Sequence, residues 1–221
     1  MSINSSHYLS IRSELAAAGV TLVAVSKVQP VEAILKLYEL GQRDFGENYV
    51  QELVDKYQKL PKDIRWHFIG HLQTNKVKYI APFVHLVHGV DSFKLFKEID
   101  KQAAKAQRKI DVLLQVHIAE EETKFGLNAA ELEETWKQIV AEPSAHARAV
   151  GLMGMASFTS DEARLRMEFE KLRGLFQKYF IDQPTVSQPV LSMGMSGDYN
   201  IAVQEGSNMV RIGSLIFGRR T

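Results

Sequence analysis

Apolar residues along this sequence fall into two patterns that alternate from one end to the other. The first is a short run in which nearly every residue is apolar, as in residues 21–27 (TLVAVSK). Such runs are typical of strands that are buried on both faces of a parallel sheet. The predicted strands are 21–27, 44–45, 66–70, 84–90, 111–118, 147–153, 190–193 and 209–212.

Between these runs, apolar residues recur three or four positions apart, which places them on one face of a helix. Residues at the boundaries agree: Pro30 stands where a helix would begin, Asn128 can cap another, and Thr159 and Glu162 have the spacing of a capping box. One further helix precedes the first strand. The predicted helices are about 6–18, 30–41, 50–57, 75–80, 92–106, 128–140, 159–179 and 198–204.

Eight strands separated by helices predict an α/β fold, a closed parallel (β/α)8 TIM barrel with an extra N-terminal helix. The sequence of 221 residues, with 45% hydrophobic composition, is long enough for one sizeable core. No linker or low-complexity segment interrupts the pattern. We therefore expect a single domain over residues 1–221.

Charge and composition exclude several classes of protein. The formal net charge of +1 provides no global field that would favour nucleic acid or an anionic membrane. The absence of cysteine excludes disulfides, thiolate catalysis and cysteine-ligated metals, and no metal site is predicted. No signal peptide or membrane-length apolar run is found, so we expect a cytoplasmic protein. No helix shows a second strong apolar face, which favours a monomer.

Lys27 ends the first predicted strand, and this position gives its amine a possible chemical use. Ligands of α/β barrels meet the protein at the C-terminal ends of the strands. A lysine among apolar walls loses hydration, which favours the neutral amine, a nucleophile toward aldehydes. Most lysines at strand ends are simply solvated, so Lys27 alone is a weak signal.

Two turns near the C-terminus resemble a phosphate cradle, since loops after strands seven and eight bind phosphate in this fold. Residues 195–198 (MSGD) join the seventh strand to a helix start, and residues 211–214 (RIGS) follow the eighth. Glycine turns needed only for tight connections are the alternative, and the carboxylate of Asp198 competes with an anion there. Closure of the barrel would place both turns beside Lys27, which strengthens the combination.

A lysine opposite a phosphate cradle suits a phosphosugar or pyridoxal phosphate, and Arg211 favours the second. Here the sequence resembles the pyridoxal phosphate homeostasis proteins, single-domain relatives of the barrel of bacterial alanine racemase. The block at 66–76 (WHFIGHLQTNK) is the most distinctive. The matching stretches are 22–27, 45–49, 66–76, 123–126, 151–155, 192–198 and 211–213.

The resemblance implies a role for particular residues. Lys27 matches the lysine that forms the Schiff base with the cofactor aldehyde, and Arg211 the arginine that faces the pyridine nitrogen. His71, Met155 and Met193 look like walls around the ring, although a histidine satisfied by backbone partners is favoured for His71. The positions implied for cofactor binding are Lys27, Asn48, Ser196, Gly197, Arg211, Gly213 and Ser214. Family members often have Thr or Ala where Ser214 stands, and its backbone amide would still serve.

A guanidinium facing the pyridine nitrogen can only donate, so the ring stays a weaker electron sink. By resemblance to alanine racemase, racemisation also needs a tyrosine from a β-domain after the barrel, and we expect no such domain here. The expected protein therefore holds pyridoxal 5'-phosphate as an aldimine on Lys27 in vitamin B6 homeostasis, without turnover and with no catalytic residue. Pyridoxal phosphate-dependent apo-enzymes are the candidate recipients.

Two other functions stay open. One is a weak amino-acid racemase in which Lys27 transfers the proton on one face. The other is a phosphosugar aldolase or isomerase with a lysine Schiff base and no pyridoxal. The sequence does not say whether the loop at 120–124 contacts a partner.

Overall fold

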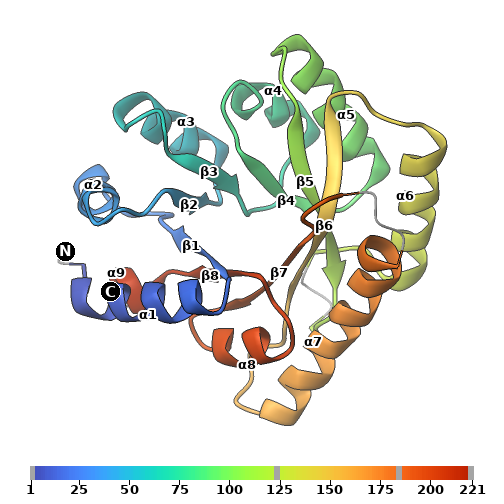
Figure 1. Ribbon diagram of the computed structural model, residues 1–221. Coiled ribbons are helices and arrows are strands. Elements are labelled where there is room, and N and C mark those ends of the chain that lie inside the picture. The colour runs from blue at the N-terminus through green and yellow to red at the C-terminus, as the bar shows by residue number, and fades with distance from the viewer. Residues whose placement is uncertain (1–2, 122–124, 183–185, 219–221) are drawn as a thin grey trace.

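The computed structural model of the protein describes residues 3–121, 125–182 and 186–218. Its eight strands run parallel and close into a barrel in sequence order, with the helices outside them (Figure 1). This confirms the predicted (β/α)8 TIM barrel. The strands are β1 (Thr21–Val25), β2 (Asp44–Glu47), β3 (Arg65–Phe68), β4 (Leu86–Val90), β5 (Ile110–His117), β6 (Ala147–Met155), β7 (Val190–Met195) and β8 (Met209–Ile212).

A helix follows each strand, and the predicted extra helix stands at the start of the chain. The helices are α1 (Ser5–Ala17), α2 (Val31–Glu39), α3 (Val50–Lys59), η1 (Thr74–Lys76), α4 (Val77–Ile80), α5 (Phe93–Lys105), α6 (Ala129–Ala141), α7 (Glu162–Phe176), η2 (Gln177–Ile181), α8 (Tyr199–Gln204) and α9 (Ser214–Phe217). In the part of the chain that the structure describes, none of them is both long and apolar enough to cross a membrane.

Strand β1 closes the barrel because it pairs with β2 on one side and β8 on the other. Ala24 is in register with Phe45 of β2, and Val23 with Arg211 of β8. Partners in register on parallel strands face the same side of the sheet, so Arg211 points inward beside Val23. The C-terminal ends of β7, β8, β1 and β2 are consecutive around the barrel, as closure required.

Two apolar clusters fill the molecule. The larger one joins strands to helices and includes Trp66, Phe45 and Phe169, each with no exposed surface. The smaller one comes from strands that face one another across the barrel, which places it in the interior. Its members are Val23, Leu86, Leu113, Val150, Met153 and Met209.

Local capping explains where the predicted helices needed correction. The predicted capping box at Thr159 and Glu162 is wrong: Asp161 is the N-cap of α7 and accepts a hydrogen bond from the amide of Arg164. Asn128 caps α6 as predicted, in a full capping box with Glu131. Helix α9 was not predicted, because four residues are too few to show a helical period.

Helices α1 and α9 lie side by side, which brings the two ends of the described chain together (Figure 1). The amide of Asn4 donates to the carbonyl of Ile216 at 3.0 Å. Helix α1 also buries Tyr8, whose hydroxyl donates to Oε1 of Gln42 at 3.1 Å. Nε2 of Gln42 donates in turn to the carbonyl of Leu22 at 2.8 Å, so α1 is tied to β1.

Candidate functional site

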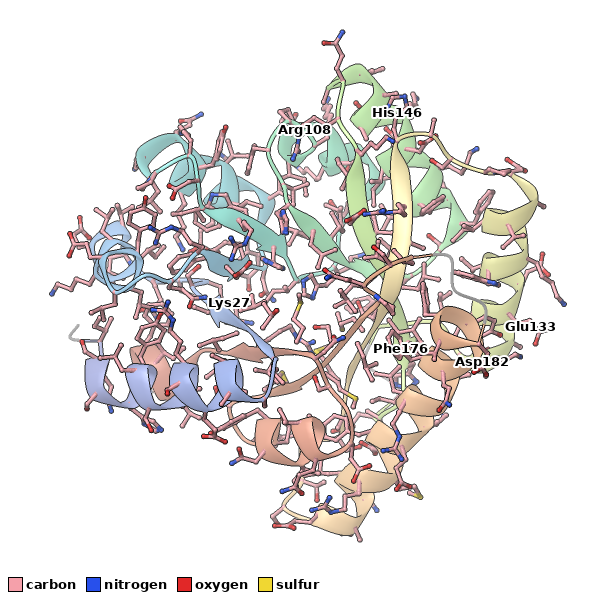
Figure 2. All side chains as sticks on the ribbon, viewed as in Figure 1. Lys27, Arg108, Glu133, His146, Phe176 and Asp182 are labelled. Atoms are coloured by element: carbon pink, nitrogen blue, oxygen red, sulfur yellow. The ribbon has the colours of Figure 1, made fainter. Side chains whose placement is uncertain are left out.

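Strand β1 ends at Val25, two residues earlier than predicted, and Lys27 follows it after Ser26, half-buried at the mouth formed by the C-terminal strand ends (Figure 2). Val28, the next residue, has φ of +61° although it is β-branched, a strained backbone conformation. Its amide donates to Oε1 of Glu52 at 2.6 Å. Such strain persists only where surrounding contacts hold it, and it fixes the direction in which the chain leaves Lys27.

A buried polar cluster behind this turn supplies those contacts. Nζ of Lys56 lies 2.7 Å from the carbonyl of Ser26, 2.7 Å from Oε1 of Glu47 and 2.7 Å from Oε1 of Glu52. The hydroxyl of Ser26 donates to the same Oε1 of Glu47 at 2.6 Å. Burial raises the pKa of Glu47, while the charge of Lys56 opposes that rise. The cluster joins the C-terminal ends of β1 and β2 to α3.

The two predicted phosphate turns are joined by a hydrogen bond. The amide of Gly213, after β8, donates to Oγ of Ser196, after β7, at 3.1 Å. Asp198 accepts the amide of Met195 at 2.6 Å, so its carboxylate is directed back to the end of β7. The competition expected from Asp198 is therefore reduced, since the carboxylate has a partner of its own.

The glycines of these turns differ in their surroundings. A Cβ on Gly197 would meet no heavy atom within 4 Å, so space is open there. A Cβ on Gly213 would lie 3.3 Å from Cβ of Val25, near the end of β1. Gly213 thus allows β8 to approach the strand that carries Lys27, and Ser214 follows it as the first residue of α9.

Asn48 follows β2 and carries an unsatisfied polar atom. Its Oδ1 is buried and has no hydrogen-bond partner. Buried polar side-chain atoms are usually paired, so such an atom is a candidate contact for a ligand. Gly70, after β3, packs against the same residue, because a Cβ there would lie 2.3 Å from the carbonyl oxygen of Asn48.

Arg211 places a buried cation inside the barrel, with 4% of the residue exposed. Nη1 donates to the carbonyl and hydroxyl of Ser192 at 2.9 and 2.6 Å, and Nη2 donates to the carbonyl of Gly154 at 2.9 Å. Burial lowers the pKa of Arg211 to about 10, partly offset by the charge of Asp198. The guanidinium therefore stays protonated at neutral pH and can act only as a donor.

Comparison with known proteins agrees with this geometry. A family model described as the N-terminal domain of alanine racemase matches residues 6–221. The pyridoxal phosphate homeostasis protein of Aquifex aeolicus is 41% identical over 200 residues, which cover 90% of this chain and 86% of the relative. That of Vibrio alginolyticus is 42% identical over 206 residues, covering 91% and 87%. The chain belongs to the pyridoxal phosphate homeostasis protein family.

Solved structures with a similar fold include a protein that has been solved with pyridoxal phosphate bound. PipY of Synechococcus elongatus, a protein solved with and without pyridoxal phosphate, is 34% identical and covers 96% of this chain and 99% of its own. Its TM-scores are 0.89 without the cofactor and 0.86 with it. Alanine racemase of Bartonella henselae is 16% identical over 96% of this chain and 59% of its own, with a TM-score of 0.70, a likeness of fold.

In this member of the pyridoxal phosphate homeostasis protein family, the three predicted wall residues have different surroundings. His71 does not rely on backbone partners: its Nδ1 lies 3.3 Å from Oδ2 of Asp91, and its ring stacks on Phe125 at 4.4 Å between centroids. It lines a cleft of about 420 Å³ after β3 and β4. Met193 has no exposed surface and belongs to the larger core, whereas Met155 is half-buried at the end of β6. Residues 122–124 of the loop at 120–124 lie outside the described residues.

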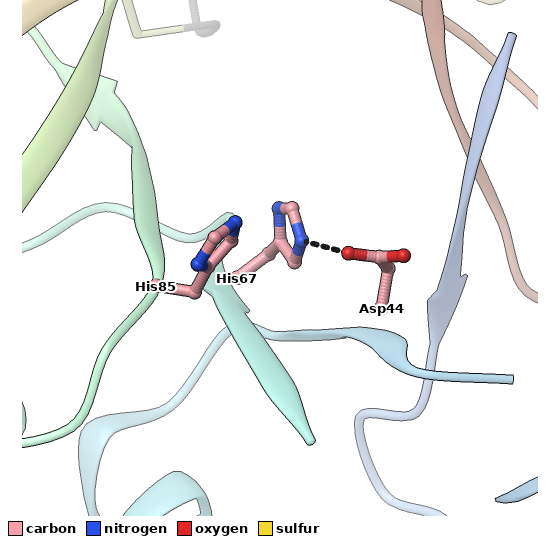
Figure 3. Close-up of side chains that lie close together, drawn as sticks. All are labelled: Asp44, His67 and His85. Atoms are coloured by element: carbon pink, nitrogen blue, oxygen red, sulfur yellow. Dashed lines mark hydrogen bonds and ion pairs between the residues drawn. The ribbon is translucent and has the colours of Figure 1, made fainter. Parts of the chain in front are cut away.

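Sequence reasoning missed a cluster at the opposite mouth. Asp44, His67 and His85 place one potential ligand atom each within 4.8 Å of one another (Figure 3). Arg65 already pairs with both oxygens of Asp44, at 2.7 and 2.5 Å, so the charge of the ionised carboxylate is balanced by a protein cation. The cluster borders a cavity of about 360 Å³. The signal was available, since all four residues stand near the starts of consecutive strands.

Proposed function

We propose that this chain binds pyridoxal 5'-phosphate at the C-terminal mouth of the barrel and serves its intracellular supply or buffering. The observation that carries the proposal is the position of Lys27 between Arg211 on one side of β1 and Asn48 on the other. The predicted phosphate turn at 213–214 follows β8, the strand that carries Arg211, and the turn at 196–197 follows β7, one strand further round. The match to this chain extends over 84 to 88% of the length of relatives that are named pyridoxal phosphate homeostasis proteins, which supports the role.

The residues present fit that cofactor. Pyridoxal phosphate, when bound, supplies an aldehyde, a phosphate and an electron-withdrawing ring. Lys27 provides the amine for the aldehyde, and the open space at Gly197 accepts the phosphate beside Ser196. The backbone amide of Ser214 is a further donor for the cradle, and the amide of Gly213 holds the Ser196 hydroxyl in place. Asn48 contributes an acceptor that no protein donor satisfies.

Arg211 makes the carrier role more suitable than catalysis. Because its guanidinium is protonated at neutral pH, Arg211 would donate to the ring nitrogen of a bound cofactor and could not accept a hydrogen bond from a protonated ring. A ring whose nitrogen stays unprotonated stabilises a neighbouring carbanion less well. We therefore propose a protein that binds and releases the cofactor without substrate turnover, and that passes it to pyridoxal phosphate-dependent apo-enzymes. Apolar side chains exposed at this mouth, Val28, Tyr49 and Phe158, suit such contacts.

Borohydride reduction of the cofactor-loaded protein, followed by mass mapping, tests the binding site. We expect one phosphopyridoxyl group, on the peptide that contains Lys27. An adduct spread over surface lysines would contradict the site, and a lysine trapped only after a phosphosugar is added would favour an aldolase or isomerase. If the protein interconverts L- and D-amino acids and Lys27→Ala abolishes this activity, the protein is a racemase and the carrier role is rejected.

Gly197→Ala should separate binding from folding. The added Cβ meets no protein atom within 4 Å, so the free energy of unfolding is expected to change by less than about 0.5 kcal/mol. The same methyl group enters the space proposed for the phosphate, so the cofactor Kd should rise about tenfold. Gly174→Ala, on α7 and equally free of neighbours, is the control that leaves the Kd unchanged. Equal Kd values for both variants would place the phosphate elsewhere.

A further inference from the structure

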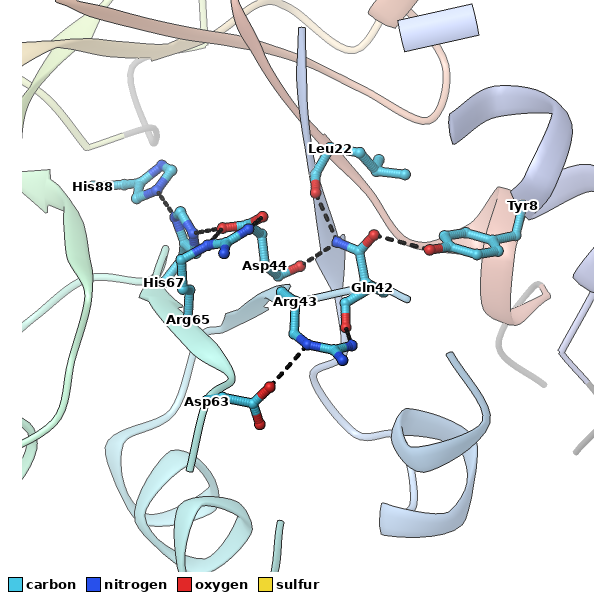
Figure 4. A network of polar contacts seen from close by, with 9 residues as sticks. All are labelled: Tyr8, Leu22, Gln42, Arg43, Asp44, Asp63, Arg65, His67 and His88. Atoms are coloured by element: carbon cyan, nitrogen blue, oxygen red, sulfur yellow. Dashed lines mark hydrogen bonds and ion pairs between the residues drawn. The ribbon is translucent and has the colours of Figure 1, made fainter. Parts of the chain in front are cut away.

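Polar side chains cross the interior of the barrel from one mouth to the other, where apolar layers are usual. They are Arg211 on β8, Ser192 on β7, His88 on β4, His67 on β3 and Asp44 on β2, here called the polar row. Oγ of Ser192 lies 2.6 Å from Nη1 of Arg211 and 3.3 Å from Nδ1 of His88. Nε2 of His88 lies 2.9 Å from Nδ1 of His67, whose Nε2 lies 3.0 Å from Oδ1 of Asp44 (Figure 4). The row is therefore continuous.

The two ends of the polar row have fixed charges. At one end the guanidinium of Arg211 has only donors to offer. At the other end, burial would raise the pKa of Asp44, but hydrogen bonds from Arg65 and His67 outweigh it and hold that pKa well below its usual range. Asp44 is thus an ionised acceptor at neutral pH. Burial also lowers the pKa of His88 well below its usual value, so this ring is neutral.

The ionised end at Asp44 gives every hydrogen bond in the polar row the same direction. A neutral His67 must carry its proton on Nε2 to donate to the carboxylate, which leaves its Nδ1 as an acceptor. His88 must then carry its proton on Nε2 to donate to Nδ1 of His67, so its own Nδ1 accepts from the hydroxyl of Ser192. The oxygen of that hydroxyl accepts from Arg211, so the row has no conflict.

We propose that Ser192, His88 and His67 are positioning residues that hold Arg211 in its donating orientation, and that Asp44 at the opposite mouth sets the direction of the row. The role of Arg211 toward the ring nitrogen rests on the proposed function; the tautomers do not. Buried polar groups in low dielectric are costly unless all are satisfied. The row satisfies its members only in one direction, which makes it sensitive to a change at either end.

Reversal of the row would disturb Arg211. If His67 had to accept at Nε2, its proton would move to Nδ1 and His88 would carry its own on Nδ1. That proton would point at Oγ of Ser192, which would then accept from both His88 and Arg211. The Ser192 proton would lose His88 as its acceptor, and a second donor would crowd the oxygen that makes the shortest hydrogen bond to the guanidinium. Asp44→Leu should cause this reversal, because it removes the acceptor at Nε2 of His67 and leaves the donors of Arg65 beside that nitrogen.

Long-range ¹H–¹⁵N NMR of histidine side chains in the cofactor-free protein tests the proposal directly. We expect His67 and His88 of the unmodified protein to be neutral with the proton on Nε2, and Asp44→Leu to shift both to Nδ1. The conservative variant Asp44→Glu should retain Nε2 protonation. Asp111→Leu is the matched control, since Asp111 also lies near the N-terminal mouth and pairs with an arginine, Arg148, at 2.9 Å. An Nδ1 proton or an imidazolium on either histidine of the unmodified protein would overturn the row.

Binding of pyridoxal phosphate supplies a second measurement. Asp44→Leu should shift the absorption band of the bound cofactor and raise its Kd about tenfold, since the oxygen that anchors Arg211 would accept a second donor. Asp111→Leu should do neither. A normal adduct on Lys27 with an unchanged band in Asp44→Leu would reject the polar row while leaving the proposed function intact. No adduct in the unmodified protein would instead reject the proposed function, while the tautomers would still decide the row.

Discussion

Replacing Lys56 with methionine is expected to lower the free energy of unfolding by about 3 to 5 kcal/mol. The Lys56 side chain is 6% exposed, and that of Glu47 is fully buried. Removing the ammonium leaves the Glu47 carboxylate without its charge partner, and one of its oxygens already has no hydrogen bond. Methionine has nearly the same shape, so the loss reflects charge and hydrogen bonding more than packing. Urea denaturation at neutral pH measures the effect.

The pH dependence of that loss identifies Glu47 as its cause. Burial raises the pKa of folded Glu47 above its unfolded value, and loss of Lys56 raises that pKa further. Between the two values the folded state binds more protons, so stability falls as pH rises. The deficit of Lys56→Met should therefore shrink toward acid pH. Lys137→Met, which breaks an exposed ion pair with Glu133, should change stability by less than about 1 kcal/mol, and an equal loss in both variants would contradict the argument.

The barrel could be predicted because each strand and helix carries its own pattern. A run such as residues 21–27 is apolar whatever surrounds it, and closure follows from the number of units. Shorter elements have no such pattern. Helix α9 spans four residues, and the cap of α7 depends on whether Thr159 or Asp161 faces the first amides, a choice that spacing alone does not make.

The mouth could be predicted from strand ends, whereas its support could not. The places of Lys27 and Arg211 follow from where the first and eighth strands end. The cluster of Ser26, Glu47 and Lys56, however, joins side chains at the ends of two strands and on a helix. Their sequence separation of 9 to 30 positions hides that pairing. The polar row is similar, because His67 and His88 look like isolated polar residues within apolar strands until strand register is known.

Lys27→Ala is expected to abolish the covalent link to pyridoxal phosphate and to raise the Kd of the cofactor about a hundredfold, roughly 3 kcal/mol. The phosphate turns and Arg211 do not depend on the lysine side chain, since the bond between Gly213 and Ser196 joins other strands. Weak, non-covalent binding should therefore persist. Mass spectrometry after reduction measures the adduct, and fluorescence titration the Kd.

Lys76→Ala is the matched control, because Lys76 is an exposed lysine of η1, beyond the end of β3 on the same side of the barrel. It should keep both the adduct and the Kd. Full loss of binding in Lys27→Ala, with no residual affinity, would mean that the turns do not hold the phosphate by themselves. An adduct that survives in Lys27→Ala and disappears in Lys76→Ala would move the site from β1 to the region after β3. Residual binding without an adduct is the result that a pre-built phosphate cradle beside a single reactive amine requires.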